Sequence, residues 1–255
     1  MNTPLALPGF LKVLASESRF ELLGLLRSPG FVIPTLSFPL GFYSFFGLAI
    51  NGGDWQPATY LLATYATFGI MGPALFGLGG GLAMDRGAGL LTMKQASPLP
   101  MSAYLGAKLA TAMVFALAVV LLLSLVAGFF GGVAMERWRW GLLFVVMVTG
   151  TLPFAAIGLL IGALMQGQAA YAVVNLVYLP MALLSGLWVP LAIFPELLQT
   201  LAVLWPSYYL SQIALWIVDQ PAQLTPLPAI ASFLAYTVAC LAAANWAFKR
   251  MRVLR

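Results

Sequence analysis

The chain has 255 residues, of which 62% are hydrophobic and only 7% are charged, and its formal net charge at pH 7 is +5. A soluble domain carries about 25% charged residues, so this composition excludes an ordinary soluble globule and fits a protein whose apolar surface is covered by lipid. The apolar runs are continuous rather than alternating, which favours helices over a membrane β-barrel. We therefore expect an all-α integral membrane protein.

Long charge-free stretches define the predicted membrane spans. Three such intervals run between Lys108 and Glu136, between Arg139 and Glu196, and between Asp219 and Lys249. Because about 20 apolar residues cross a bilayer as a helix, each interval is long enough to span. We predict six spans, at residues 31–50, 58–84, 104–132, 141–165, 169–190 and 228–248.

The N-terminal segment, residues 1–28, predicts an amphipathic helix ahead of the first span. Within residues 10–27 an apolar stripe recurs at helical spacing, with basic residues beside it; its members are Leu11, Leu14, Ala15, Leu22, Leu25 and Leu26. No charge-free stretch of the signal-peptide type precedes residue 28, so we expect no cleaved leader. We expect this helix to lie on the cytoplasmic surface of the membrane.

Residues 85–103, which we call the elbow, join spans two and three on the cytoplasmic side. A short helix over 88–96 would be stopped by Pro98 and Pro100, and Ser102 can cap the helix that follows. The short helix offers leucine, methionine and lysine side chains to a partner or a bilayer. From these residues alone, a rigid element that transmits a push and a plain amphipathic loop both remain open.

Residues 191–227 form the loop between spans five and six. Within it, residues 197–218 are uncharged and long enough to cross the membrane. We prefer two short re-entrant helices broken at Trp205-Pro206, because proline interrupts helical hydrogen bonding. A crossing would also place the two basic ends of the chain on opposite faces of the membrane.

The distribution of basic residues predicts the orientation. Ten of the twelve Lys and Arg residues lie in the N-terminal segment, in or next to the elbow, or in the C-terminal tail, and only Arg137 and Arg139 lie on the other side. Positive residues are retained in the cytoplasm, so we expect both termini and the elbow to be cytoplasmic.

Several kinds of chemistry are missing from the chain. There is no histidine, which removes most hydrolase and zinc sites, and no glycine precedes any of the four lysines, which removes a P-loop. No acid or base lies deep within a predicted span, where it could couple transport to an ion gradient; Lys108 stands only just inside the start of span three. We expect no enzyme, although a channel or a carrier that holds an ion by backbone carbonyls stays open.

The elbow and the outer loop resemble the type-2 permease family of ATP-binding-cassette transporters. Residues 84–108, which contain the elbow and the start of span three, match at Asp85, Arg86, Gly87, Pro98, Leu99, Pro100, Tyr104 and Lys108. Residues 185–210, which run from the end of span five into the outer loop, match at Ser185, Gly186, Trp188, Pro190, Pro195, Pro206 and Tyr208. The chain departs from the family in having Asp85 where Glu is frequent and in lacking further acids after it, and its outer loop carries no large domain.

The resemblance implies that residues 1–255 form one permease domain in the bacterial inner membrane. It implies a homodimer, or a heterodimer with a similar chain, bound to two copies of a cytoplasmic ATPase. ATP and Mg²⁺ would be held by that ATPase, and this chain would bind no cofactor. We expect no nucleic acid among its partners. The residues expected to couple to the ATPase are Asp85, Arg86, Leu90, Leu91, Met93 and Lys94.

In this family spans two and five line the substrate cavity. On span two the candidate stripe is Tyr60, Thr64, Thr67 and Met71, and on span five it is Tyr171, Asn175, Tyr178 and Ser185, with Trp188 beyond. These uncharged faces suit a hydrophobic or amphipathic substrate such as a drug, natural product or lipid. Helix packing with an interfacial aromatic belt is the alternative. A membrane component of an antibiotic- or stress-sensing complex is the alternative function.

Overall fold

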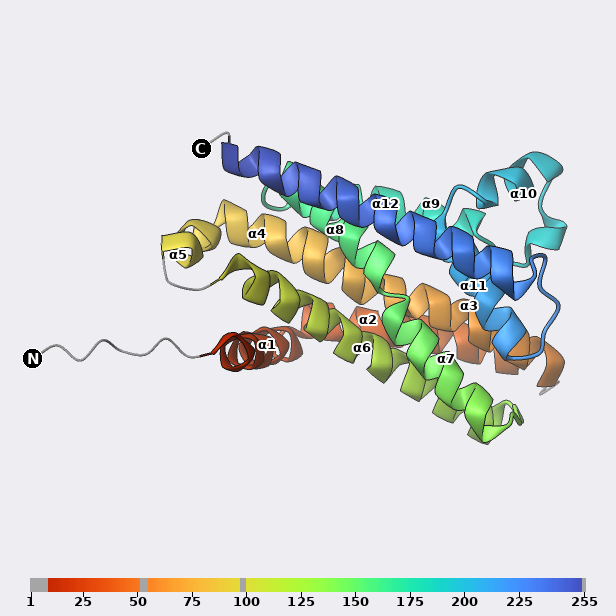
Figure 1. The fold of residues 1–255 in the computed structure, drawn as a ribbon. Coiled ribbons are helices and arrows are strands. Elements are labelled where there is room, and N and C mark those ends of the chain that lie inside the picture. The colour runs from red at the N-terminus through yellow and green to blue at the C-terminus, as the bar shows by residue number, and fades with distance from the viewer. Residues whose placement is uncertain (1–8, 51–54, 97–99, 254–255) are drawn as a thin grey trace, which may run out of the picture.

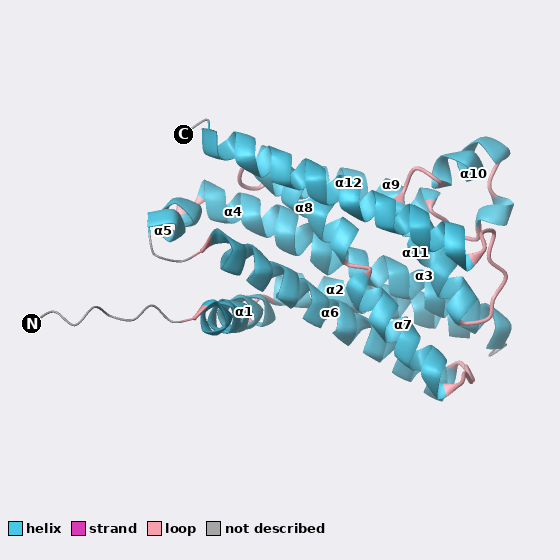
Figure 2. Cartoon of the chain, viewed as in Figure 1, coloured by secondary structure: helices cyan, strands magenta, loops and turns pink. Residues whose placement is uncertain are grey.

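The structure is a computed structural model, and it describes residues 9–50, 55–96 and 100–253. Every regular element in these ranges is a helix (Figure 2). The elbow residues Pro98 and Leu99 that carry part of the family resemblance lie outside the described ranges. The expected all-α fold is confirmed for the part of the chain that the structure describes.

The helices follow one another with short connections (Figure 1). The first half of the chain contains α1 (Phe10–Leu26), α2 (Pro29–Phe42), the π-helix η1 (Tyr43–Ala49), α3 (Trp55–Ala74), the π-helix η2 (Leu75–Gly80), α4 (Gly81–Gly87), α5 (Leu90–Ala96) and α6 (Met101–Phe130). The second half contains α7 (Arg137–Thr149), α8 (Leu152–Leu164), α9 (Ala169–Leu184), the 3-10 turn η3 (Leu191–Ile193), α10 (Glu196–Ala202), α11 (Pro206–Ile217) and α12 (Pro226–Val253).

Within the described residues, five helical segments are long and apolar enough to cross a membrane. They are Pro29–Ala49, Pro57–Gly87, Met101–Phe130, Arg137–Leu164 and Pro226–Ala247. The fifth predicted span, 169–190, is helical only over the 16 residues of α9. Such a helix is about 24 Å long, less than the ~30 Å hydrocarbon core of a bilayer. It ends because Gly186 adopts a positive φ of 72°, which turns the chain out of the helix.

Prolines and glycines shape the spans locally. Each π-helical segment follows a proline within the same continuous helix, Pro39 before η1 and Pro73 before η2. Proline removes one backbone donor and crowds the preceding turn, so the helix widens to recover its hydrogen bonds. The fourth span bends where α7 gives way to α8 at Gly150, which lies closely against Leu210 of α11.

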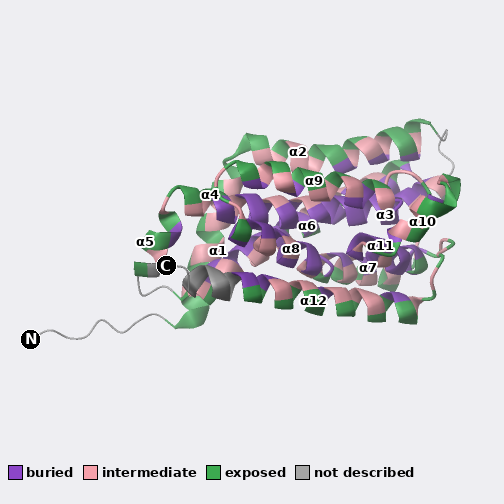
Figure 3. Ribbon diagram, turned by 90° about the horizontal axis from the view of Figure 1, so that it is seen from above, coloured by how far each residue is buried: buried purple, intermediate pink, exposed green. Residues whose placement is uncertain are grey.

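The segment formed by α3, η2 and α4 is the centre of the bundle. In an apolar stretch of 18 residues within this segment, 89% of the residues are buried. The corresponding fractions are 17% for the span formed by α2 and η1 and 22% for α12. Figure 3 shows this contrast, with buried residues gathered on the inner helices and exposed residues along α2 and α12. The exposed residues of the outer helices are largely apolar, for example Phe38, Leu234 and Val238. A surface of this kind fits a hydrocarbon environment.

The two ends of the bundle differ. Helices α1 and α5 and the C-terminal end of α12 lie at one end, which we call the elbow end, and α10 lies at the other (Figure 1). In the same view α1 is seen nearly end-on while the spans run across the page, so α1 lies across the bundle rather than along it. It packs against α6, where its Leu14 reaches Gly106. Leu11 and Leu26, which sequence analysis placed on the same stripe as Leu14, are exposed.

Two short helices occupy the loop between α9 and α12. Helix α10 ends at Ala202 and α11 begins at Pro206, so the chain breaks where Trp205-Pro206 predicted it. Helix α11 is mostly buried against α3 and α12, including its polar residues Ser207, Ser211 and Gln212. The Gln212 side-chain oxygen accepts a 2.6 Å hydrogen bond from the backbone of Gln223, which fixes the start of the loop into α12.

Candidate functional site

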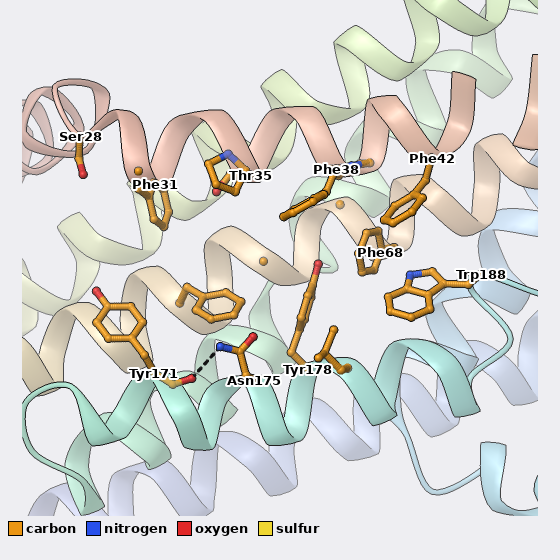
Figure 4. Close-up of a pocket in the computed structure, with 17 residues that line it drawn as sticks. Ser28, Phe31, Thr35, Phe38, Phe42, Phe68, Tyr171, Asn175, Tyr178 and Trp188 are labelled. Atoms are coloured by element: carbon orange, nitrogen blue, oxygen red, sulfur yellow. Dashed lines mark hydrogen bonds between the residues drawn. The ribbon is translucent and has the colours of Figure 1, made fainter. Parts of the chain in front are cut away.

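A groove with a volume of about 570 Å³ lies between α2, α3 and α9 (Figure 4). Aromatic side chains form most of its walls: Phe31, Phe38 and Phe42 from α2, Phe68 from α3, Phe76 from η2, Tyr171 and Tyr178 from α9, and Trp188 from the segment after α9. No charged residue lines it among the residues that the structure describes. The polar side chains among its described lining residues supply hydroxyls, the amide of Asn175 and the indole N–H of Trp188.

The aromatic rings of the groove contact one another in a continuous row. Phe68 stacks on Tyr178 with ring centroids 5.2 Å apart and meets Trp188 edge-on at 5.5 Å. Phe76 lies 5.4 Å from Tyr178 and 6.3 Å from Tyr171. These separations are typical of favourable aromatic pairs, each worth about 0.5–1.5 kcal/mol. The row therefore holds the walls in place and presents polarizable ring faces and edges to the groove.

Helical spacing places these residues on one side of each helix. Along α3 and its continuation η2, the groove residues Phe68, Gly69, Gly72 and Phe76 recur at steps of one, three and four, which keeps them on one face. Gly72 opens the floor, since a Cβ there would stand 3.7 Å from the hydroxyl of Tyr178 and a longer side chain would enter the groove. Gly69 has a different role: a Cβ there would collide with the Val119 side chain, so this glycine permits close packing of the helices beside the groove.

The structure brings together three of the residues predicted for the substrate path. Tyr171, Asn175 and Tyr178 all line the groove from α9. The amide nitrogen of Asn175 donates a 3.1 Å hydrogen bond to the backbone oxygen of Tyr171, one turn earlier, so the amide is held along the helix (Figure 4). Trp188, named with this stripe, lines the groove at its far end.

The remaining predicted path residues lie elsewhere. Thr64, Thr67 and Met71 are buried and do not line the groove, and the Thr67 hydroxyl donates a 2.9 Å bond to the Ala63 carbonyl. Tyr60 is half-buried and does not line the groove. The geometry gives these residues a packing position, and their role in a substrate path stays an untested prediction.

Ser185 has a different structural place from the rest of its predicted stripe. It is buried, and its hydroxyl lies 2.6 Å from that of Ser207. This contact fastens the end of α9 to the start of α11. Ser185 therefore does not line the groove but lies at the junction between α9 and the two short helices of the outer loop.

Sequence analysis missed the α2 wall and the aromatic face of α3. The threonines of α3 were predicted to face the substrate path because they are polar. A buried threonine in an apolar helix, however, commonly donates its hydroxyl to a carbonyl of the preceding turn. The available signal was the pair of phenylalanines at 68 and 76 with two glycines between them. An aromatic stripe interrupted by glycines marks a face with room beside it.

A group of charged side chains joins α1 to the elbow. The Lys108 side chain of α6 is only 3% exposed, and its amino group lies 2.7 Å from Glu21 of α1 and 3.0 Å from Asp85 of α4. The Tyr104 hydroxyl donates to the same Asp85 carboxylate, and Lys94 of α5 pairs with Glu17 of α1. A buried ammonium is stable only when it is paired in this way. We call this group the ionic cluster.

Arg86, the next predicted coupling residue, is directed into the protein. One of its guanidinium nitrogens donates to the carbonyls of Gly162 at 3.0 Å, Ala163 at 2.5 Å and Met165 at 3.1 Å. These carbonyls belong to the C-terminal turn of α8, which carries negative partial charge. The backbone nitrogen of Gly167 also donates to Ala83. The end of α4 is thereby tied to the turn that leads into α9.

The short helix α5 presents two different faces. Leu91 is 1% exposed and packs with the buried side chains of Leu82 and Tyr104. Leu90 and Met93 are 45% and 69% exposed at the elbow end. Of the six predicted coupling residues, these two are the apolar ones that a partner can reach, and the others are engaged within the chain.

The chain thus combines span-length helices with an uncharged aromatic groove among the described residues. A family model described as ABC-2 type transporter matches residues 17–218, and the chain belongs to that family. A protein of Bacillus subtilis (strain 168) that is named as a transport permease, YvfS, is 28% identical over 204 residues, which cover 78% of this chain and 82% of YvfS. The family resemblance of the elbow and outer loop is thus confirmed. The chain is a multi-pass membrane protein and a transport permease component of an ABC transporter.

Proposed function

We propose that this chain is the permease subunit of an ATP-driven exporter that moves a hydrophobic or amphipathic molecule out of the cytoplasm or the inner leaflet. The aromatic groove carries the proposal. Its volume of about 570 Å³ falls within the ~300–1,000 Å³ of sites for drug-sized ligands. Its walls offer ring faces and a few hydroxyls but no charge, which favours apolar or weakly polar substrates over ions.

Energy would come from a separate ATPase that binds ATP and Mg²⁺, with no cofactor on this chain. Among the described residues that line it, the groove has no acidic or basic side chain that could couple transport to an ion gradient. The exposed Leu90 and Met93 of α5 form the expected docking point for the ATPase. On this reading the elbow end faces the cytoplasm of a bacterial inner membrane, with both chain termini on that side, in agreement with the basic residues found there.

The contacts of the elbow supply a route from the ATPase to the groove. A push on α5 reaches α4, which continues through η2 into α3 and so into one groove wall. The Arg86 bonds carry the same push to the end of α8 and the turn before α9, which forms another wall. The functional unit we propose is a pair of permease chains with two ATPase copies, in which α10 and α11 enter the outer leaflet without crossing and close the far side.

The first experiment is purification of the tagged chain from its native cells in mild detergent, followed by mass spectrometry. We expect a nearly stoichiometric ATPase that carries Walker motifs. Vesicles containing that complex should then accumulate an apolar fluorescent substrate when ATP is supplied. A chain that purifies alone in several detergents would overturn the ATP-driven mechanism. A complex whose ATPase responds to a compound without moving it would point to a sensing complex instead.

A further inference from the structure

Helix α1 divides its charges between two faces. It contains three cations, counting Arg27 at its C-cap, and two acids. Both acids point into the protein, where Glu17 pairs with Lys94 and Glu21 with Lys108. Sequence alone gives this helix a nearly balanced charge. The structure removes the acids from its outer surface.

The three cations share the other face. Lys12, Arg19 and Arg27 are separated by seven and eight residues, which is about two helical turns each, and all three are exposed. Within the part of the chain that the structure describes, none of them takes part in a salt bridge. The line of charge is therefore about 22 Å long and has no acid to offset it.

Large apolar side chains flank these cations. Leu11 is 76% exposed, Phe20 is 68% exposed and Leu26 is 51% exposed, all on α1. Because α1 lies across the elbow end of a bundle of span-length helices, its long side runs along the plane in which the membrane surface must lie (Figure 1). Exposed cations alternating with exposed apolar groups are typical of helices that rest between headgroups and acyl chains.

We propose that the outer face of α1, formed by Lys12, Arg19, Arg27 and Phe20, is a binding surface for anionic phospholipid headgroups. The inference goes beyond the proposed transport function and does not depend on it. Charge complementarity selects the occupant, since a zwitterionic headgroup gives three cations no net counter-charge and an anionic one does. Phe20 and Leu11 fit the acyl boundary below the headgroups.

The proposal also gives a reason for the inward acids. The ionic cluster holds Glu17 and Glu21 against the elbow, so lipid bound on the outer face and lysines bound on the inner face hold α1 from both sides. Anionic lipid would thereby fix the helix that supports Lys94 and Lys108. Loss of the lipid contact would loosen α1 without altering the groove itself.

The test measures lipid association with the full chain in vesicles. Spin-labelled phosphatidylglycerol and phosphatidylcholine are compared by the fraction that the protein immobilises. We expect the wild-type chain to prefer the anionic lipid several-fold and to lose that preference as salt is raised towards 1 M, where the screening length is about 3 Å. Because one cation near the surface contributes at most ~1 kcal/mol, a factor of about fivefold, removal of one cation should lower the preference at low salt and removal of all three should abolish it.

Matched variants separate the face from general charge. Arg19→Gln, alone and with Lys12→Gln and Arg27→Gln, should reduce the preference, whereas Arg137→Gln, an exposed arginine at the opposite end, should not. Arg19→Lys should keep it. A wild-type chain that shows no anionic preference at low salt would overturn the proposal, and this readout needs no variant. Arg19→Gln could also leave the lipid preference unchanged and lose a co-purifying protein. That result would assign the face to a protein partner and would overturn the lipid proposal.

Discussion

Replacing Lys108 by methionine tests whether the ionic cluster holds α1 onto the bundle. Methionine keeps most of the apolar length of the lysine stem, so packing changes little and the charge is the main loss. Without the ammonium, Glu21 and Asp85 face each other across the α1–α4 junction with no cation between them. The expected result is a less stable protein in which α1 leaves α6 more readily.

The magnitude follows from burial. Removing one partner from a fully buried ion pair costs about 3–5 kcal/mol because a charge is left without compensation. Here the carboxylates are 23% and 26% exposed, so water partly solvates them after the change. We therefore expect Lys108→Met to lower the free energy of unfolding by about 2–3 kcal/mol. Adding Glu21→Gln removes the repulsion with Asp85, so the double variant should be about 1 kcal/mol more stable than the sum of the single changes.

The assay combines unfolding in detergent with a cross-link between helices. In a Cys240→Ala background, cysteines at Leu14 and Gly106 report contact between α1 and α6, since these positions touch in the structure. The cross-link should form more slowly in Lys108→Met. Lys12→Met, an exposed lysine on α1, is the matched control and should shift stability by no more than about 0.5 kcal/mol. Equal effects of the two lysine variants, or strict additivity with Glu21→Gln, would refute the reasoning.

Two further predictions address the elbow and the groove. The double variant Leu90→Ala with Met93→Ala should weaken ATPase binding by roughly 30-fold, about 2 kcal/mol, without lowering stability, because both side chains are exposed. The buried Leu91→Ala should instead lower the free energy of unfolding by about 2–5 kcal/mol. Pull-down titrations measure the binding and melting curves the stability, and unchanged ATPase binding in the double variant would contradict the docking point. Gly72→Leu should fill the groove and weaken substrate binding by about 1–3 kcal/mol in a fluorescence titration while the protein stays folded. Gly69→Ala, whose Cβ would collide with Val119, should instead lower the melting temperature. Normal substrate binding in Gly72→Leu together with an unchanged melting temperature in Gly69→Ala would show that the groove is misplaced.

Some features of the fold were predictable because they depend on local composition. Charge-free stretches identified five segments that the structure shows as span-length helices, since a long apolar run has few alternatives to a membrane helix. The break before Pro206 was predictable for the same kind of reason, because proline acts on its own turn. The shortness of α9 was missed, since only the positive φ of Gly186 shows that the helix ends there.

The sequence by itself determined that this chain is a helical membrane permease with a short elbow helix. Only the tertiary structure decided which face of each helix is used. It placed Phe68 rather than Thr67 on the groove, turned Leu91 inward, and paired Lys108 with Glu21 across 87 positions of the chain. In an apolar span nearly every residue is compatible with lipid or with core, so periodicity cannot choose between them. The choice is made by the neighbouring helices, whose contacts link residues far apart in sequence.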